Sequence, residues 1–412
     1  MSIGPHRLVD AAEPPRRTVR EFVDSGVQRV RAGDLGFAPV LLGLAIIWAV
    51  FAILNPVFLS PTNLVNLTMQ AAPTGVIAIG IVLLLLIGEI DLSVGSVSGL
   101  AGAILAVGSV QLALPLPLVI LAALACGPIV GLVYGFIYTR FGVPGFVLTL
   151  AGLLAALGVQ LRVLGTAGSV TIPFDSVIVQ FGQQMFVPAP VMYALDAVVI
   201  AAVAWRLISE SRRRAQAGLS TRSPLSIGLR VGALAAILLL CTWYLGSGAG
   251  RGVGAMVLLF VALVAGTHVL LTRTRFGRAV YAVGGSVEGA RRAGIRVARV
   301  QITLFVMCST FAALGGILAA ARLAGANQSS GGGDVFLNAI AAAVIGGTSL
   351  FGGRGSAFAA LLGVLVLTSI SVGLTLLSLD SSVRYMVTGA VLVLAVVIDS
   401  ISRRSRAAAG KA

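Results

Sequence analysis

The chain has 412 residues, of which 58% are hydrophobic and only 10% are charged, and its formal net charge is +15. A soluble globular domain carries about 25% charged residues, so this composition excludes a water-soluble particle of this size. The basic residues lie in short clusters between apolar stretches, which is typical of cytoplasmic loops in a membrane protein and argues against a nucleic-acid-binding protein.

Repeated apolar stretches, each long enough to cross a bilayer, predict an all-α fold, a polytopic transmembrane helical bundle of about twelve spans (range 10–12). The tenth stretch is short and bounded by glycines, which is typical of a re-entrant or broken helix. The predicted spans are 38–54, 72–88, 93–110, 117–138, 145–164, 188–207, 228–246, 253–271, 299–321, 335–350, 356–377 and 383–399.

The distribution of arginine predicts the domain organisation. Residues 1–36 are polar and arginine-rich and are expected to form a retained cytoplasmic tail. Residues 37–400 form the transmembrane domain, with a cytoplasmic loop at 272–298, and residues 401–412 form a second cytoplasmic tail. With both termini in the cytoplasm, nearly all arginine clusters fall on the inner side.

The chain lacks the sequence motifs of phosphate binding, metal binding and catalysis. It lacks the phosphate-binding sequence G-x-x-x-x-G-K-[ST], and its one lysine is Lys411. It has two histidines and no H-E-x-x-H or paired-cysteine spacing. We therefore expect no catalytic residue, no metal site and no cofactor. A membrane-embedded enzyme ranks well below a transporter that takes its energy from another source.

Three patterns mark places of interest along the spans. Gly127, Gly131 and Gly135 predict close helix packing. Glu89 and Asp91 interrupt a long apolar region, and two interpretations stay open: Asp91 or Ser93 caps the next helix, or the carboxylates are functional. The glycine pairs around 346–353 predict a break in the backbone.

The loop 272–298 is longer than a helix connection needs. Ser286 as an N-cap, Glu288 in the first turn and Gly294 as a stop predict a short helix from about 286 to 293. Such a helix lies on lipid headgroups or docks into a groove of a soluble partner. The pattern alone slightly favours lipid.

At these residues the chain resembles the permease subunits of bacterial ABC importers for monosaccharides, in the ribose and xylose branch. The resemblance covers about 38–400. An additional stretch around 165–250, with two further spans, resembles the xylose-type members. The matching strings are Asn55–Leu64, Gly88–Ser96, Pro144–Leu150, Phe276–Ile295, Ala339–Gly355 and Leu394–Asp399.

The resemblance implies a permease of the bacterial inner membrane, working with cytoplasmic ABC ATPase subunits, an extracytoplasmic sugar-binding protein and a second permease copy as a homodimer in membrane lipid. It assigns the 277–295 stretch to the helix that couples to the ATPase, which replaces the preference for lipid. We assign this coupling to Gly285, Glu288, Arg291 and Gly294.

The expected substrate is a monosaccharide, D-xylose or a related pentose. A neutral sugar needs scattered hydrogen-bonding groups along its path, with specificity left to the binding protein. The alternative is an ion-coupled secondary transporter of a small solute with Glu89 and Asp91 as its ion site. The assigned path residues are Glu89, Asp91, Ser96, Thr149, Gln160, Arg162 and Asn338, to which Gln70, Thr74 and Ser98 are added as candidates.

Overall fold

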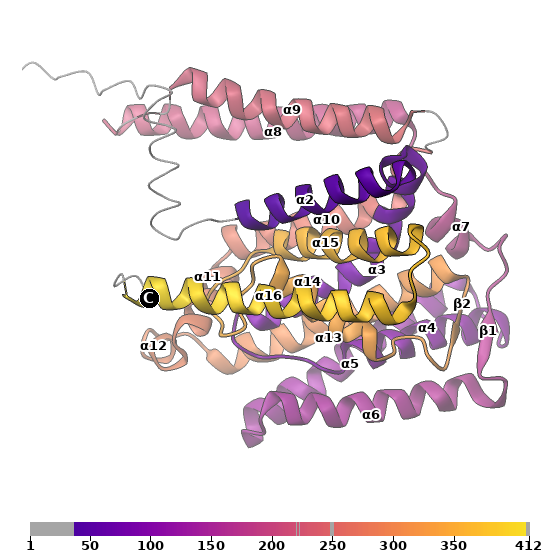
Figure 1. The fold of residues 1–412 in the computed structure, drawn as a ribbon. Coiled ribbons are helices and arrows are strands. Elements are labelled where there is room, and N and C mark those ends of the chain that lie inside the picture. The colour runs from indigo at the N-terminus through magenta and orange to yellow at the C-terminus, as the bar shows by residue number, and fades with distance from the viewer. Residues whose placement is uncertain (1–36, 220, 222, 248–250, 409–412) are drawn as a thin grey trace, which may run out of the picture. The chain divides into compact units, whose positions relative to one another are not determined.

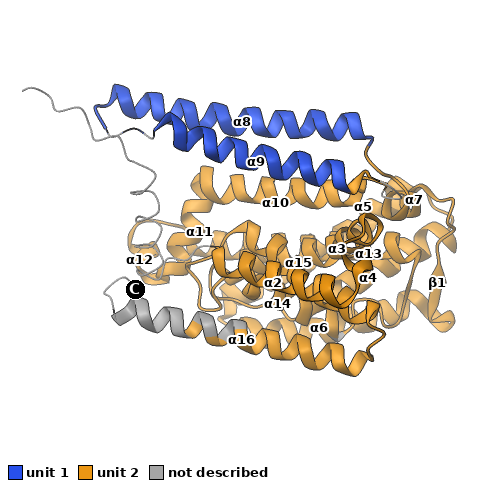
Figure 2. Ribbon diagram, turned by 45° about the horizontal axis from the view of Figure 1, so that its top comes forward, with its two compact units in different colours: residues 1–35, 188–244 blue, residues 36–187, 245–412 orange. Residues whose placement is uncertain are grey.

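The computed structural model describes residues 37–219, 221, 223–247 and 251–408, and these divide into two compact units. Unit 1 holds residues 188–244, and unit 2 holds 36–187 and 245–412 (Figure 2). The predicted tail 1–36 and the last four residues lie outside the described part of the chain. Each of the twelve predicted spans overlaps a helix.

Helices dominate the first half of unit 2, and half of them begin at a proline or directly after one. Proline fits the first turn because that position needs no backbone donor. Unit 2 opens with α2 (Ala38–Leu54), η1 (Pro56–Leu59), α3 (Pro61–Leu85), α4 (Val94–Val110), α5 (Leu116–Phe141), α6 (Gly145–Leu164), η2 (Gly165–Ala167), β1 (Ser169–Thr171) and α7 (Val177–Gln183) (Figure 1).

The second half of unit 2 returns to the same bundle. It holds α10 (Ala255–Arg273), α11 (Arg275–Gly285), α12 (Val287–Arg292), α13 (Val297–Leu323), β2 (Gly325–Asn327), α14 (Gly333–Ile345), α15 (Ala357–Leu376) and α16 (Ser381–Ala408). β1 and β2 pair antiparallel with Val170 opposite Ala326. This small sheet is an addition to the predicted all-α fold. It lies at the end of unit 2 opposite α11 and α12 (Figure 1).

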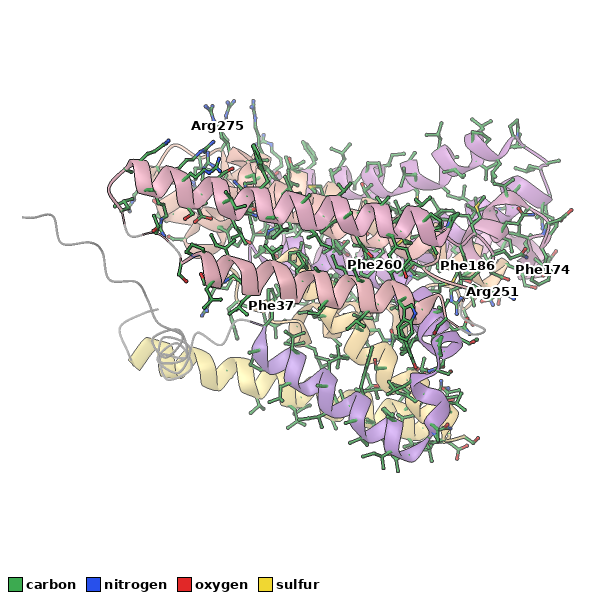
Figure 3. The ribbon with its side chains drawn as sticks, turned by 90° about the horizontal axis from the view of Figure 1, so that it is seen from above. Phe37, Phe174, Phe186, Arg251, Phe260 and Arg275 are labelled. Carbon is green, nitrogen blue, oxygen red and sulfur yellow. The ribbon has the colours of Figure 1, made fainter. Side chains whose placement is uncertain are left out.

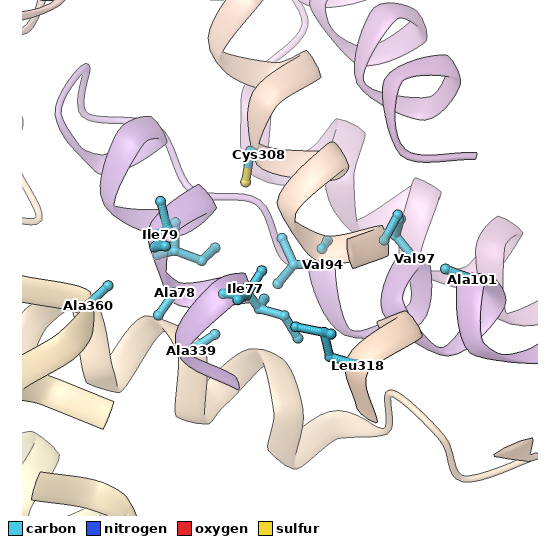
Figure 4. Close-up of a cluster of buried hydrophobic side chains, with 14 of the residues drawn as sticks. Ile77, Ala78, Ile79, Val94, Val97, Ala101, Cys308, Leu318, Ala339 and Ala360 are labelled. Atoms are coloured by element: carbon cyan, nitrogen blue, oxygen red, sulfur yellow. The ribbon is translucent and has the colours of Figure 1, made fainter. Parts of the chain in front are cut away.

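The core of unit 2 is built by α13 packing along α3, α4 and α5. Figure 4 shows Cys308 and Leu318 of α13 near Ile77 of α3 and Val94 of α4, all of them buried. A side chain added at Gly127, Gly131 or Gly135 of α5 would overlap the backbone of α13, so the prediction of close packing at these glycines is confirmed.

Unit 1 is a pair of helices, α8 (Ala189–Gln216) and α9 (Pro224–Leu245), whose apolar side chains are mostly exposed. Their interior contact is polar: Thr242 Oγ1 donates a 2.7 Å hydrogen bond to the buried Asp196 carboxylate. An apolar helix surface with a buried polar pair is typical of helices that face lipid and pair through hydrogen bonds.

Among the described residues, eight helices are long and apolar enough to cross a membrane. They are α3, α5, α6, α8, α9, α10, α13 and α15. The other four predicted spans, α2, α4, α14 and α16, are apolar but shorter in their apolar part. The polytopic all-α membrane architecture is confirmed, and the count of twelve crossings stays a prediction.

Candidate functional site

The loop between α10 and α13 folds into two capped helices. Thr274 Oγ1 accepts a 3.0 Å hydrogen bond from the Gly277 amide at the start of α11, and Ser286 Oγ accepts one of 3.0 Å from Gly289 at the start of α12. α12 ends at Arg292, and Gly294, two residues further on, has a left-handed φ of +78°. The predicted short helix, its cap and its stop are confirmed, whereas α11 was not predicted.

The end of α12 is a Schellman motif. The Gly294 amide donates to the Arg291 carbonyl, and the Ile295 amide donates to the Ala290 carbonyl, each at 3.0 Å. This pattern needs a left-handed residue at the position of Gly294, which glycine adopts without a steric penalty. The chain therefore leaves α12 in a fixed direction and enters α13.

α12 presents charged groups on its surface. The Glu288 carboxylate lies 3.4 Å from Arg291 and 3.2 Å from Arg292, and the three side chains are 57%, 67% and 80% exposed. Exposed ion pairs of this kind contribute at most about 1 kcal/mol. A partner protein can therefore exchange these pairs for its own at little cost.

α11 is tied to two other parts of unit 2. The Tyr281 hydroxyl donates a 2.9 Å hydrogen bond to the Gly355 carbonyl, and the Gly353 amide donates one of 2.8 Å to the Leu86 carbonyl. Gly284 packs so closely that a Cβ would overlap the Leu86 carbonyl and the Gly353 amide. We call this contact of Tyr281, Gly284, Leu86 and Gly353–Gly355 the junction.

The junction links α11 directly to the end of α3 and to the loop that precedes α15. Burial raises the pKa of the Tyr281 hydroxyl, so it stays protonated and keeps donating at neutral pH. Tyr281 bonds a backbone carbonyl, and the Gly353–Leu86 bond is backbone to backbone, so we expect a displacement of α11 to move the ends of α3 and α15 as well.

The loop 346–356 contains the predicted break. Gly347, Gly352 and Gly353 have left-handed φ values of +99°, +84° and +73°. α14 ends at Ile345 rather than at 350, because residues with left-handed backbones cannot continue a right-handed helix. The predicted end of the tenth span was therefore wrong by about one turn.

A second non-helical segment, residues 86–93, connects α3 to α4. It opens with the same motif as the end of α12: Gly88, with φ +79°, donates to the Leu85 carbonyl, and Glu89 donates to the Leu84 carbonyl. α4 begins directly after this segment, at Val94.

Glu89 is held by two helices. Its carboxylate accepts a 2.6 Å hydrogen bond from the Tyr138 hydroxyl of α5, and its other oxygen lies against Gly145 at the start of α6. A helix N-terminus favours a negative charge. Burial raises the pKa of Glu89, and the hydrogen bond from Tyr138 partly opposes that shift. Glu89 also lines a cavity of about 500 Å³ between α5, α6 and α13.

Asp91 is fully buried and fixes the entrance to α4. Its Oδ1 accepts hydrogen bonds from the Ser93 amide at 2.8 Å and the Ser93 hydroxyl at 2.6 Å. The Ser93 side chain makes no capping bond, so the capping interpretation is wrong for Ser93. Thr149 of α6 accepts a 3.2 Å bond from the Leu92 amide and holds the same segment.

The other assigned path residues lie in different places. Gln160 is fully buried and donates to the carbonyls of Asn327 at 3.1 Å and Ser330 at 2.9 Å, which anchors the segment after β2. Ser96 is buried on α4, and Arg162 is exposed in the last turn of α6. Asn338 lines a separate cavity of about 230 Å³.

The assigned path residues therefore do not converge on one cavity: Glu89 and Asn338 line two different ones, and Asp91, Thr149 and Gln160 brace the backbone.

The sequence reasoning missed Tyr281 and Arg384. An arginine near the start of the last span, on the side predicted to be outside, departs from the positive-inside rule and was the signal for Arg384.

Comparison with known proteins agrees with this architecture. Residues 63–396 match the family described as the branched-chain amino acid transport system / permease component. The chain is 39% identical to the xylose transport system permease protein XylH of Escherichia coli (strain K12), over 84% of this chain and 87% of that protein.

Two further relatives extend the similarity. The XylH protein of Haemophilus influenzae is 36% identical over 91% of this chain and 99% of its own length. The ribose import permease protein RbsC of Bacillus subtilis (strain 168) is 32% identical over 87% of this chain and 91% of its own length. No solved structure matches the chain.

The matched region runs through all of α4–α15, including the junction and both cavities. The apolar helices place the chain in a membrane. The chain therefore belongs to the permease family of ABC transporters, in which it is similar to the xylose-type members, and it is a multi-pass protein of the bacterial inner membrane.

Proposed function

We propose that this chain is the membrane-spanning subunit of an ATP-driven importer for D-xylose or a related pentose. The observation that carries this is the junction, in a chain that resembles XylH over most of its length. α11 and α12 form a compact surface element that is joined to α3 and α15, as a coupling device requires. The chain has no phosphate-binding motif, so ATP hydrolysis belongs to a separate subunit.

In this proposal the ATPase binds α12 through Glu288, Arg291 and the backbone around Gly285 and Gly294. Closure of the ATPase then shifts the population between outward- and inward-open bundles. The extracytoplasmic binding protein delivers the sugar at the opposite end, where Figure 3 shows Phe174, Phe186 and Arg251 far from Arg275. Two copies of the chain, each with twelve crossings and cytoplasmic termini, enclose the path as a homodimer in lipid.

The test is uptake by proteoliposomes that contain the permease, its ATPase and its binding protein. We expect ATP-dependent xylose uptake that falls at least tenfold with Glu288→Arg, together with loss of ATPase from the purified complex. A charge reversal of the opposite sign at the exposed Arg212 of α8, Arg212→Glu, is the control and is expected to leave both readouts unchanged.

Two outcomes would contradict the proposal. Unchanged uptake and unchanged association with Glu288→Arg would remove α12 from the coupling surface. Uptake that continues without the ATPase and collapses with an uncoupler would select the ion-coupled secondary transporter, with Glu89 and Asp91 as its ion site.

A further inference from the structure

Four helices direct polar side chains into the cavity that contains Asn338. The cavity measures about 230 Å³. On each helix the two polar residues are three or four positions apart, which places them on one face. They are Gln70 and Thr74 of α3, Asp334 and Asn338 of α14, Thr368 and Ser371 of α15, and Arg384 and Thr388 of α16, with Tyr385 beside them.

Most of these polar groups have no partner within the protein. In the described part of the chain, the side chains of Gln70, Thr74, Asp334 and Asn338 form no hydrogen bond with another protein group. Arg384 donates to the hydroxyls of Thr375 at 3.4 Å and Ser381 at 2.6 Å. Thr74 and Asn338 are half-buried, whereas Gln70 and Asp334 are exposed. Polar groups that line a cavity between apolar helices and have no protein partner are available to a polar ligand. The cavity is therefore equipped for a polar ligand.

The donors and acceptors fit a neutral ligand with several hydroxyl groups. The amides of Gln70 and Asn338 both donate and accept, Asp334 accepts and Arg384 donates, and a sugar hydroxyl does both. The acidic and basic side chains balance each other in charge. The ring of Tyr385, which is 65% exposed, offers an apolar surface to the C–H groups of a sugar.

The cavity lies toward the end of unit 2 that is opposite the junction. Asp334 is in the first turn of α14, whose other end runs into the loop 346–356. Arg384 is near the start of α16, just after the turn that follows α15. Two of the lining helices, α3 and α15, are the helices that the junction holds at their other ends.

We propose that this cavity is a transient binding site for a monosaccharide that has left the binding protein. The assignment rests on the proposed function. Movement of α11 shifts α3 and α15 and so changes the distances between the groups that hold the sugar. Sugar release is thereby linked to the ATPase without any contact between the two.

The first test measures transport by the full complex with saturating binding protein. Asn338→Ala and Gln70→Ala are expected to lower xylose uptake about three- to tenfold, the effect of losing one or two hydrogen bonds. They are also expected to change the ratio of xylose to arabinose uptake, which a general loss of folded protein does not. Hydrolysis of ATP without sugar stays at the wild-type rate.

The control is Thr310→Ala on α13, because this hydroxyl only donates to the Val306 carbonyl of its own helix, at 2.6 Å. If wild-type complex imports xylose and the cavity variants keep its rate and its sugar ratio, the cavity assignment is wrong and the proposed function stands. If wild-type complex imports no sugar with ATP, the proposed function fails.

A second test does not depend on transport. Asn338→Cys is made in a permease whose Cys126, Cys241 and Cys308 are replaced by alanine, and its modification by a thiol reagent is followed in the assembled complex. We expect millimolar xylose to slow the modification at least threefold and leucine to have no effect. Equal rates with and without xylose would overturn the assignment, and protection by leucine alone would make the cavity a zwitterion site.

Discussion

Alanine at Gly284 inserts one methyl group into the junction. The added Cβ would lie on the Leu86 carbonyl oxygen and 2.7 Å from the Gly353 nitrogen, and neither backbone atom can rotate away. Overpacking of this kind costs about 1–3 kcal/mol. Separation of the surfaces also weakens the 2.8 Å hydrogen bond from Gly353 to Leu86, which contributes about 1 kcal/mol. The gain in helix propensity, at most about 1 kcal/mol, offsets only part of this.

The net cost of about 1–3 kcal/mol corresponds to roughly a fivefold to 150-fold change in an equilibrium. We therefore expect Gly284→Ala to lower ATP-dependent uptake at least fivefold while the ATPase stays bound, because α12 is untouched. Uptake and ATP hydrolysis are measured together in proteoliposomes, and the ratio of sugar moved to ATP hydrolysed should fall.

Two matched variants make this result specific. Gly266→Ala on α10 adds the same methyl group where no atom lies within 4 Å and should behave as wild type. A Cβ at Gly285 also has no atom of this chain within 4 Å, so a change in uptake caused by Gly285→Ala is attributed to its contact with the ATPase. If Gly284→Ala matches Gly266→Ala in uptake and in its ratio to hydrolysis, the junction does not transmit motion.

Three further changes test individual elements. Gly294→Ala forces a left-handed alanine at the end of α12, which costs about 1–2 kcal/mol and should weaken retention of the ATPase in pull-down assays. Gly131→Val drives α5 away from the α13 backbone, and we expect it to lower the melting temperature of the detergent-solubilised protein by several degrees, as overpacking of about 1–3 kcal/mol implies. Thr242→Val leaves the buried Asp196 carboxylate without its donor, at a cost of about 1–3 kcal/mol, so the protease sensitivity of the α8–α9 pair should rise. An unchanged value in any of these three assays would contradict the contact that the assay tests.

The coupling helix shows how far local sequence rules reach. Ser286, Glu288 and Gly294 predict a cap, a first-turn acid and a stop, and each lies as expected because these features depend on neighbouring residues alone. Tyr281 is different. Its hydroxyl bonds a carbonyl 74 positions away, and no local pattern encodes that partner.

Glu89 is a second residue whose role depends on partners that are distant in the sequence. In the sequence it is one of two carboxylates that interrupt a long apolar region, and a short turn beside a helix cap and a functional role are equally reasonable for the pair. In the structure the Tyr138 hydroxyl and the start of α6 surround it, so its charge has partners that lie about fifty residues away in the chain. The two roles could not be separated before those partners were placed.

By itself the sequence determined that the chain lies in a membrane, roughly where its long helices run, and where the capped helix α12 begins and ends. These features follow from hydrophobic length and from contacts within one turn. Only the tertiary structure decided which polar residues share a cavity and which brace the backbone. That outcome depends on which helix faces meet, and side chains from α3, α14, α15 and α16 become neighbours only when the bundle packs.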